Sequence, residues 1–439
     1  MKINSLLLGL LNDYELSGKY VNLSLSSHSL DKLSPDERRS VTAIFYTAVE
    51  RKLTLDYYIG ALANRSVSDI DMGTLNLLRL GACQIIYMDS IPDYAAVNEC
   101  VSLGRGKGER SFVNAVLRAI SRAKADGTLP MPKRERNPQR YLSIKYSFPL
   151  WICKLLCNLY GEEDAEAILQ GFNETQYTDI VVNTTKISRD EYRALLSEAG
   201  IDAHDSEYSH LTLRIPHSVN PTRLPYFAEG YFFVQDTACT ASVIALGASE
   251  GERVVDVCAC PGGKSFAASI LMGGTGEILS LDLHESKLSL ITDGANRLSL
   301  SNITARQCDA RTPFDSEAAG FDRVICDVPC SGLGVLGKKA DMRYSRSLED
   351  VESFPELQSD ILESSQRYLK VGGTLIYSTC TLNPCENEGV VNAFLDRHEE
   401  FELVPFVLEN GEKCQGMFTF KPHIHHTDGF FVAKLKKTR

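Results

Sequence analysis

Several features that define other classes of protein are absent from this sequence. Its early apolar run, residues 6–11, is interrupted by Gly9 and is too short to span a bilayer or to form the core of a signal peptide. The chain contains no internal repeat and no low-complexity segment, and 44% of its residues are hydrophobic. Disordered and fibrous classes are therefore excluded. We expect a globular protein in the cytoplasm, with no membrane partner.

The sequence also lacks a cysteine framework. Its cysteines number 13, which is odd, and none of them form a C-x-x-C pair, so we expect reduced thiols and no structural zinc. His423, His425 and His426 lie close together but lack companion carboxylates or cysteines at ligand spacing, which predicts a surface or RNA-facing loop and no metal. Residues 434–439 are expected to form a solvated basic tail.

A net positive charge is missing as well. The formal charge is −11, and a uniformly acidic surface would repel a polyanion. The charge is unevenly distributed, however, because residues 105–154 carry twelve Lys and Arg against three Asp and Glu, a net charge of +9. These twelve are Arg105, Lys107, Arg110, Arg118, Arg122, Lys124, Lys133, Arg134, Arg136, Arg140, Lys145 and Lys154.

The length of 439 residues predicts two to four domains. Residues 1–125 carry apolar side chains at helical spacing, with Asp69 and Asp71 as candidate caps, which predicts a helical bundle. Residues 126–144 contain Asp126-Gly127 and the proline-rich stretch 130–138 and are expected to form a basic linker.

The rest of the chain predicts two further domains. Residues 145–240 combine an expected helix at 150–172 with short β-rich pieces at 180–183 and 211–215, which indicates a small α+β domain. In residues 241–439, buried strands alternate with helices, which predicts a parallel, doubly wound Rossmann-like sheet. Its expected strands are residues 253–259, 277–283, 321–328, 373–378 and 429–434.

A turn with the features of a cofactor loop follows the first of these strands. It reads Cys258-Ala259-Cys260-Pro261-Gly262-Gly263-Lys264 and precedes an expected helix at residues 265–271. Adjacent glycines let a backbone approach a ligand closely, and a helix N-terminus offers unpaired N–H groups. The turn matches neither G-x-G-x-x-G nor a P-loop, so by itself it is equally compatible with a plain tight turn.

Two acidic residues extend this pattern. Asp282 ends the next strand, where an acidic side chain in a Rossmann unit accepts hydrogen bonds from ribose hydroxyls; a helix N-cap is the alternative. Asp309 ends a third short stretch, where a carboxylate can meet an adenine amino group. Together with the turn, they indicate a ligand of the adenosyl type.

Two cysteines follow later strands directly. Cys330 comes after Asp327-Val328-Pro329, and Cys380 comes after Ser378-Thr379, so both are expected at carboxyl ends of strands, where open α/β sheets bind ligands. A thiol at such a position suits nucleophilic chemistry. One such use is addition to C6 of a cytosine, because C5 is too electron-poor to attack a methyl donor until a nucleophile has added at C6. Asp327 could then hydrogen-bond the ring as charge builds on it. The residues alone do not decide which cysteine attacks.

A structural role is the alternative for any single cysteine, because cysteine usually behaves as a small buried hydrophobe. Cys258 and Cys260 are expected to pack beside the cofactor loop, and a redox disulfide between Cys330 and Cys380 stays open. The structural role is assigned to Cys83, Cys100, Cys153, Cys157, Cys239, Cys308, Cys326 and Cys414.

Across nearly its whole length the sequence resembles the bacterial 16S rRNA cytosine-5 methyltransferases of the RsmB (Sun) type. Residues 77–82, 91–99 and 112–118 are similar to the helical domain that this family shares with the antitermination factor NusB. That resemblance implies RNA binding, in agreement with the basic stretch. It also implies S-adenosylmethionine as cofactor and a specific cytosine of 16S rRNA, of the C967 type, as the target. Protein partners stay open.

The resemblance assigns roles to individual residues. Residues 258–264 match the methionine-binding loop, while Asp282 and Asp309 match the ribose and adenine contacts. Asp327 matches the acid between the methyl donor and the base. Cys380 matches the family's nucleophile, and Cys330 matches the cysteine that assists release of the methylated product.

Four positions depart from the family pattern, namely Val181, Cys260, Ala340 and Cys385. Val181 and Ala340 are expected to alter RNA contacts. Three other functions stay open: methylation of another RNA such as tRNA or 23S rRNA, methylation of DNA with Cys330 attacking, and RNA binding by a non-catalytic assembly factor.

Overall fold

The computed structural model describes residues 3–17, 30, 33–174 and 177–439, and these form two compact units. The N-terminal unit comprises residues 1–173 together with 339–346, and the C-terminal unit comprises residues 174–338 and 347–439. The division falls after Asn173, although the α+β domain was expected to begin at residue 145. Phe148 packs against Phe172 at a ring-centroid distance of 5.9 Å, and Asn173 donates to the Tyr146 carbonyl, which ties this segment to the helical unit.

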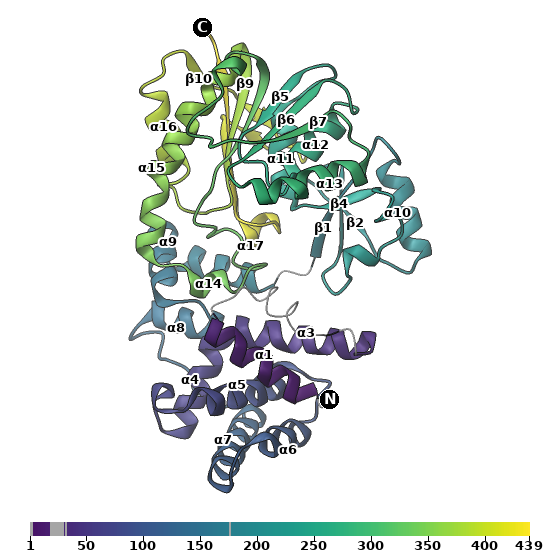
Figure 1. Ribbon diagram of the computed structural model, residues 1–439. Helices are drawn as coiled ribbons and strands as arrows, with labels where there is room; N and C mark the ends of the chain where they lie inside the picture. The colour runs from purple at the N-terminus through teal and green to yellow at the C-terminus, as the bar shows by residue number, and fades with distance from the viewer. Residues whose placement is uncertain (1–2, 18–29, 31–32, 175–176) are drawn as a thin grey trace. The chain divides into compact units, whose positions relative to one another are not determined.

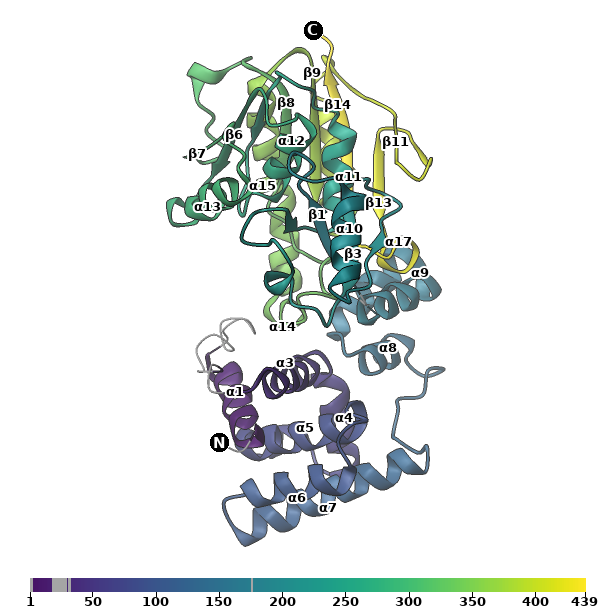
Figure 2. The same ribbon diagram turned by 90° about the vertical axis from the view of Figure 1, so that its right-hand side faces the viewer.

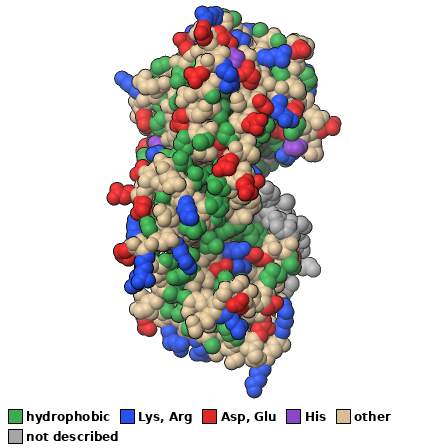
Figure 3. Space-filling model, turned by 90° about the vertical axis from the view of Figure 1, so that its left-hand side faces the viewer, with side chains coloured by type: hydrophobic (Ala, Val, Ile, Leu, Met, Phe, Trp, Pro, Cys, Tyr) green, Lys and Arg blue, Asp and Glu red, His purple; other side chains and the backbone are tan. Residues whose placement is uncertain are grey.

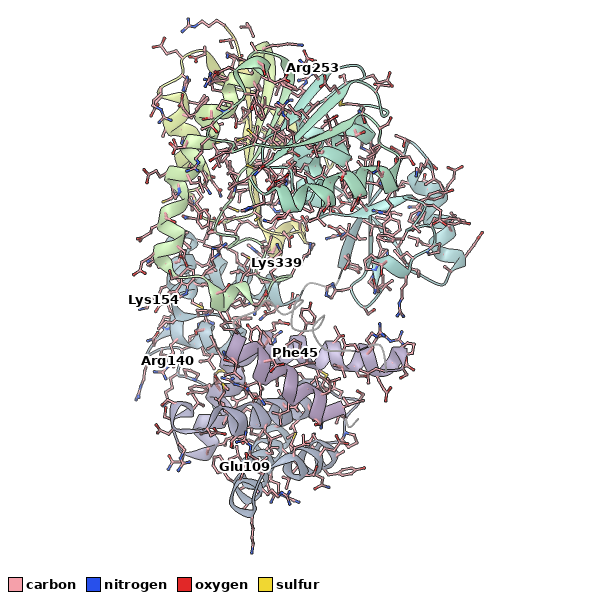
Figure 4. All side chains as sticks on the ribbon, in the orientation of Figure 1. Phe45, Glu109, Arg140, Lys154, Arg253 and Lys339 are labelled. Atoms are coloured by element: carbon pink, nitrogen blue, oxygen red, sulfur yellow. The ribbon has the colours of Figure 1, made fainter. Side chains whose placement is uncertain are left out.

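The N-terminal unit is helical, as predicted (Figure 1). Its apolar core includes the fully buried Phe45, labelled in Figure 4. Helices α6 and α7 run side by side in Figures 1 and 2. The helices are α1 (Ile3–Ser17), α3 (Pro35–Glu50), α4 (Lys52–Ala63), η2 (Val67–Asp69), α5 (Met72–Tyr87), α6 (Asp93–Leu103), α7 (Lys107–Ala125), α8 (Pro138–Tyr146) and α9 (Leu150–Asn173).

Two expected signals mark the boundaries of these helices. The carboxylate of Asp71 caps α5 by accepting from the backbone N–H of Thr74, whereas Asp69 lies within η2. Helix α8 begins at Pro138, inside the stretch that was expected to be a linker. Proline fits the first turn of a helix because its missing N–H would have no partner there, and the Asn137 side chain caps that turn.

The C-terminal unit begins with a small antiparallel sheet of order β2-β3-β1-β4, which confirms the predicted α+β character. Its core includes Tyr192 and Phe232. The two β-rich pieces expected at 180–183 and 211–215 lie in or beside β1 and β3. The elements are β1 (Tyr177–Val182), α10 (Arg189–Glu198), β2 (His204–Asp205), β3 (Thr212–Pro216), η3 (Pro221–Arg223) and β4 (Phe232–Val234).

The larger sheet of the C-terminal unit has the order β10-β14-β9-β8-β5-β6-β7 and confirms the Rossmann-like prediction. Strands β7, β6, β5, β8 and β9 are parallel neighbours. These strands are β5 (Arg253–Asp256), β6 (Glu277–Asp282), β7 (Ile303–Gln307), β8 (Phe321–Asp327) and β9 (Leu369–Thr379); the helices between them are α12 (Gly263–Leu271), η4 (Glu285–Lys287), α13 (Leu288–Leu298), η5 (Asp315–Glu317), α14 (Met342–Ser345), α15 (Leu348–Ser365) and η6 (Gln366–Tyr368), and α11 (Thr237–Leu246) precedes β5.

Each face of this sheet has its own apolar layer, because successive side chains in a strand point to opposite faces. Val254 faces the cluster that includes residues of α11, α12 and α13, while Val255 faces the cluster that includes residues of α15 and α16 (Glu388–Leu395). The sheet therefore lies between two helical layers (Figure 1), and its parallel strands deliver their carboxyl ends to one edge.

The last strand differs from the prediction of a parallel sheet. β14 (Phe430–Lys437) runs antiparallel to β9, with Phe431 opposite Thr379. β14 pairs antiparallel with β13 (Met417–Phe420), which precedes it in the chain. The chain therefore turns back at the edge where the parallel strands end and enters β14 in the opposite direction. The prediction of a solvated basic tail at 434–439 was therefore wrong for residues 434–437, which form the end of β14. The remaining elements are β10 (Phe401–Leu403), β11 (Phe406–Val407), β12 (Lys413–Cys414) and α17 (Pro422–His425).

The histidine cluster was also assigned incorrectly in part. His425 is buried, its Nδ1 accepts from the backbone N–H of Lys421, and its ring packs on Phe418 and Phe420. The apolar neighbours explain its burial, which the spacing of the histidines does not reveal. In the described part of the chain no group of three potential ligands is placed to hold a metal ion, and no helix is long and apolar enough to cross a membrane.

Candidate active site

The predicted cofactor turn connects β5 to α12, as the sequence indicates. Gly262 has a φ of 111°, a backbone conformation that residues other than glycine rarely adopt. A Cβ on Gly263 would lie 2.1 Å from Oε1 of Gln235, so a larger residue there would displace the Gln235 side chain. The backbone N–H groups in the first turn of α12 lack partners within the helix and are candidate donors to a polar ligand.

Asp282 lies beside this turn, and Asp309 lies one residue after Cys308, which is hydrogen-bonded to the Asp282 backbone. At the end of β6, one carboxylate oxygen of Asp282 accepts from the Cys260 N–H at 3.3 Å, and the other accepts from the His284 N–H at 3.0 Å. Cys308, next to Asp309, donates its N–H to the Asp282 carbonyl. The structure therefore brings the two acidic residues together, as expected for the ribose and adenine ends of one ligand.

Arg311 is a partner of Asp309 that the sequence did not reveal. The Asp309 carboxylate accepts from the Arg311 backbone N–H and from its guanidinium at 2.7 Å. The hydrogen bonds from the Arg311 side chain and backbone hold the pKa of Asp309 below its usual range.

Asp327, at the end of β8, is paired with Lys264 of the cofactor turn. Its Oδ2 lies 2.6 Å from Lys264 Nζ, and its Oδ1 accepts from the Ser378 hydroxyl at 2.7 Å. Burial opposes protonation of Lys264, but the charge of Asp327 prevails and raises the pKa of the ammonium group. This pair joins the cofactor turn to the ends of β8 and β9.

The two predicted cysteines lie side by side at the same edge. Cys330 follows β8 and Cys380 follows β9, and their Sγ atoms are 3.2 Å apart. Both residues are half-buried. The Cys380 carbonyl accepts from the backbone N–H of Gly334, which fixes the loop after Cys330 against the loop after Cys380. The geometry joins two thiols, an ion pair and a ligand turn in one place.

Other thiols near this edge are poor candidates for chemistry. Burial raises the pKa of Cys258 well above its usual range and that of Cys326 to about 12. Cys260 is half-buried, and its Sγ lies 3.8 Å from the Lys287 carbonyl. Of the eight cysteines predicted to be structural, six are buried and two, Cys157 and Cys239, are intermediate. No disulfide links any of the thirteen cysteines, all of which lie among the described residues.

A buried charged cluster borders the site and was not anticipated. Lys338 Nζ lies 2.5 Å from Asp236 and 3.2 Å from Asp428, so two carboxylates share one ammonium group. Burial and the neighbouring charge of Asp236 raise the pKa of Asp428 to about 7. The cluster fixes the turn before β14, where the Gly429 N–H donates to the Gly334 carbonyl.

Glu386 was also missed. It is fully buried between β9 and α16, and its carboxylate accepts hydrogen bonds from the loops of both cysteines. Only the polar run Asn383-Pro384-Cys385-Glu386-Asn387 hints at it in the sequence, and such a run is usually exposed.

The positions that depart from the family pattern lie in different parts of the structure. Val181 is fully buried in β1 and packs in the apolar core, so its side chain is not at the surface and an effect on RNA contacts would be indirect. Ala340 is buried within the N-terminal unit, whereas Cys385 is exposed.

The basic stretch lies in the N-terminal unit, and ten of its twelve Lys and Arg are exposed. Lys124 and Lys145 are the two that are partly buried. Arg140 and Lys154, labelled in Figure 4, lie on α8 and α9. Figure 3 shows Lys and Arg side chains spread over the surface of this unit. These charges are positioned to meet a polyanion.

The residues of the site fit S-adenosylmethionine. The glycine turn and the first residues of α12 follow β5, and Asp282 and Asp309 offer acceptors at the ends of the next two strands. Oδ1 of the fully buried Asp256, at the base of the turn, has no hydrogen-bond partner among the described residues. The fold and this site together define a methyltransferase that depends on S-adenosylmethionine.

Comparisons with known families agree with this class. Residues 243–436 match the model described as 16S rRNA methyltransferase RsmB/F, residues 1–122 match the NusB family, and residues 148–221 match the ferredoxin-like domain of RsmF/B-like methyltransferases. The chain is 34% identical to a probable ribosomal RNA small subunit methyltransferase B of Synechocystis sp., over 98% of both chains. It is 32% identical to the ribosomal RNA small subunit methyltransferase B of Pseudomonas putida, over 96% of this chain and 95% of the relative.

Solved structures show the same similarity. The crystal structure of PH0851 aligns with a TM-score of 0.77 and 26% identity, covering 99% of this chain and 97% of that one. A methyltransferase homolog from Pyrococcus horikoshii aligns with a TM-score of 0.60 and 26% identity, covering 69% of this chain and 99% of that one. The chain belongs to the RsmB/F family of 16S rRNA methyltransferases.

Proposed function

We propose that this protein transfers a methyl group from S-adenosylmethionine to C5 of a specific cytosine in 16S rRNA, at a site of the C967 type. The observation that carries the proposal is the 3.2 Å separation of the Cys330 and Cys380 sulfurs, at the strand ends that also hold Lys264 and Asp327. Two thiols within reach of one base meet the need for one group that attacks and another that assists release.

Cys380 is the proposed nucleophile. Its sulfur adds to C6 of the cytosine, which makes C5 electron-rich enough to accept a methyl group. Asp327 stands beside the ring. As the sulfur adds, the proton lost by the thiol passes to N3, and the Asp327 carboxylate accepts the hydrogen bond from this N3–H. Lys264 and Ser378 hold that carboxylate in place.

Cys330 is proposed to assist release. Once C5 carries the methyl group, its proton must leave before the bond between C6 and Cys380 can break. A second sulfur close to the first is positioned to help that elimination. The matched family motifs assign attack to Cys380 and release to Cys330, and the adjacency of the sulfurs is compatible with that division.

S-adenosylmethionine is held by residues of the strand ends. The proposed contacts are residues 258–264 for the methionine part, Asp282 for the ribose and Asp309 for the adenine. When bound, the cofactor supplies an electrophilic methyl group on its sulfonium sulfur. Lys264 serves both the turn and Asp327, so it ties the cofactor region to the base region.

RNA is proposed as the substrate because of the N-terminal unit. Its exposed basic side chains can bind phosphates, and a splayed-out base is the usual target in RNA recognition. The names of these relatives refer to ribosomal RNA of the small subunit, which supports 16S rRNA over other RNAs.

The test is methylation of defined RNAs by the purified chain. We expect 5-methylcytosine, separated chromatographically from other methylcytidines, in 16S rRNA and at a single position in bisulfite sequencing. Transfer RNA, 23S rRNA and DNA of matched length should stay unmodified. Methylation at another ring position, or of those controls alone, would refute the proposal.

A further inference from the structure

Glu386 is a fully buried carboxylate that accepts four close hydrogen bonds. Its Oε2 accepts from the backbone N–H of Ser331 at 2.8 Å and from Nε2 of Gln358 at 3.0 Å. Its Oε1 accepts from the hydroxyl of Ser331 at 2.6 Å and from Nδ2 of Asn383 at 3.1 Å. Each oxygen therefore faces two close donors, and Oε1 also accepts from the Thr381 hydroxyl at 3.4 Å.

These donors come from both cysteine loops. Ser331 directly follows Cys330, and Asn383 lies three residues after Cys380. The Ser331 hydroxyl also lies 2.8 Å from the hydroxyl of Thr381, which directly follows Cys380. The carboxylate thus connects the two loops through their nearest neighbours.

Gln358, the third residue that donates to Glu386, fixes the backbone before Cys330. Gln358, on α15, donates both to Glu386 and to the carbonyl of Pro329 at 3.0 Å. Pro329 and Ser331 flank Cys330, so the backbone on both sides of this cysteine is tied to one buried carboxylate.

The residues around Glu386 hold the backbone around Cys380 in the same way. The Thr379 hydroxyl donates to Oδ1 of Asn387 at 2.5 Å, and Nδ2 of Asn387 donates to the Thr381 carbonyl at 3.0 Å. The Tyr377 hydroxyl donates to the backbone carbonyl of Glu386 at 2.6 Å. Residues 386 and 387 therefore hold both neighbours of Cys380.

This carboxylate forms no ion pair with a Lys or Arg of the described residues, and all four close donors are neutral. Burying a carboxylate without a cation is unfavourable unless several donors satisfy it. An amide would fit less well. Its NH2 would meet the Ser331 N–H and the Gln358 NH2 on one side, or the Asn383 NH2 on the other, where only the Ser331 hydroxyl can also accept. The site therefore favours a carboxylate over an amide.

We propose that Glu386 is a positioning residue that sets the spacing of Cys330 and Cys380. It does not contact the reacting atoms; it holds the two loops so that the sulfurs stay 3.2 Å apart. Its catalytic meaning rests on the proposed function, in which both sulfurs serve one base. The spacing itself can be measured without any methylation.

The experiment compares Glu386→Gln with the wild type in two assays. In the first, the full-length protein is treated with diamide, which takes two protons and two electrons from a pair of thiols and leaves a disulfide and the reduced hydrazine. Peptide mapping then gives the rate at which Cys330 becomes joined to Cys380. We expect this rate to fall by about tenfold or more in the variant.

The second assay measures methylation of 16S rRNA. We expect kcat to fall by on the order of 100-fold, because misplacement of a reacting group by about 1 Å has effects of that size. KM for RNA and for S-adenosylmethionine should change by no more than about threefold, since neither ligand contacts Glu386. The matched control is Glu388→Gln, which removes a carboxylate two residues away and leaves every hydrogen bond between the loops intact.

A weaker variant guards against failure to fold. Ser331→Ala keeps the backbone donor and removes the hydroxyl that joins Glu386 to Thr381, so we expect intermediate losses in both assays. Circular dichroism and S-adenosylmethionine binding establish that each variant is folded. A folded Glu386→Gln protein with wild-type cross-linking would overturn the proposal, whether or not its kcat falls.

The two proposals fail in different ways. Slower cross-linking in Glu386→Gln combined with no 5-methylcytosine from the wild type would reject the proposed reaction and uphold the role of Glu386 in spacing. Normal methylation by the wild type combined with unchanged cross-linking in Glu386→Gln would uphold the proposed reaction and reject the role of Glu386 in spacing.

Discussion

Asp256 shows how a single buried acid at the base of the cofactor turn makes stability depend on pH. It is fully buried, Ser265 donates to one of its oxygens at 2.8 Å, and burial raises its pKa to about 7. The folded protein therefore holds a proton on this group at pH values where the unfolded chain has lost it. Its contribution to stability falls as the pH rises from about 4 to about 7, by about 1.4 kcal/mol per pH unit.

Asp256→Asn should remove this dependence, because an amide does not titrate. We expect the melting temperature of the variant minus that of the wild type to increase from about pH 5 to about pH 8. Calorimetry at both pH values measures the difference. Parallel pH profiles for the two proteins would show that the acid is ionised in the folded state throughout.

At the scale of the element, the glycine turn between β5 and α12 is the part of the cofactor site most sensitive to shape. Gly263→Ala would place a Cβ 2.1 Å from Gln235 Oε1, so either the Gln235 side chain or the turn must move. We expect the Kd for S-adenosylmethionine, measured by calorimetry, to rise by about tenfold or more. Gly108→Ala is the control, because a Cβ there meets no atom within 4 Å. Unchanged affinity in Gly263→Ala would remove this turn from the cofactor site.

The junctions between strands and turns could be predicted from the sequence because each signal is local. An apolar strand followed by Gly262-Gly263, or by Pro329-Cys330, identifies both the element and its end, and parallel strands bring such ends together. Asp282, Asp327 and Cys380 were placed in this way, next to strands that the structure confirms.

The interactions that organise these junctions could not be predicted. Glu386 receives donors from residues up to 55 positions away, and nothing local shows that a polar segment is buried. Lys338 depends on Asp236 and Asp428, which three separate parts of the chain bring together. The direction of β14 depends on where the chain enters the sheet, which the spacing of apolar residues does not encode.

At the scale of the whole molecule, residues 339–346 belong to the N-terminal unit although the chain on both sides of them belongs to the C-terminal unit. Lys339, labelled in Figure 4, begins this segment. Within the N-terminal unit Arg343 is fully buried; its guanidinium lies 3.8 Å from the centroid of the Phe148 ring and donates to Asn173 at 3.0 Å. Burial lowers the pKa of Arg343 to about 10.

Arg343→Ala should destabilise the N-terminal unit by about 3 kcal/mol, because it leaves a cavity and removes the partner of Asn173. Thermal unfolding followed by calorimetry measures the loss. Lys339→Ala, which shortens an exposed side chain of the same segment, should leave the transition unchanged. Equal melting temperatures for the two variants would contradict the anchoring role of Arg343.

RNA binding should depend on the basic stretch of the N-terminal unit. Neutralising four exposed arginines should weaken binding of 16S rRNA and reduce the slope of log affinity against log salt by roughly 0.7 to 0.9 for each phosphate that the variant no longer neutralises. The variant carries Gln in place of Arg105, Arg118, Arg122 and Arg140. Its control carries Gln in place of Arg367, Lys413, Lys436 and Arg439, which are exposed on the C-terminal unit. Equal salt slopes in the two variants would place the RNA-binding surface elsewhere.

The most direct test of the proposed reaction is the covalent adduct. Cys330→Ala and Cys380→Ser proteins are incubated with 16S rRNA and S-adenosylmethionine and then separated on a denaturing gel. We predict that Cys330→Ala stays covalently attached to the RNA because release is impaired. Cys380→Ser should form neither adduct nor product. An adduct in Cys380→Ser, or equal loss of activity with no adduct in either variant, would contradict attack by Cys380.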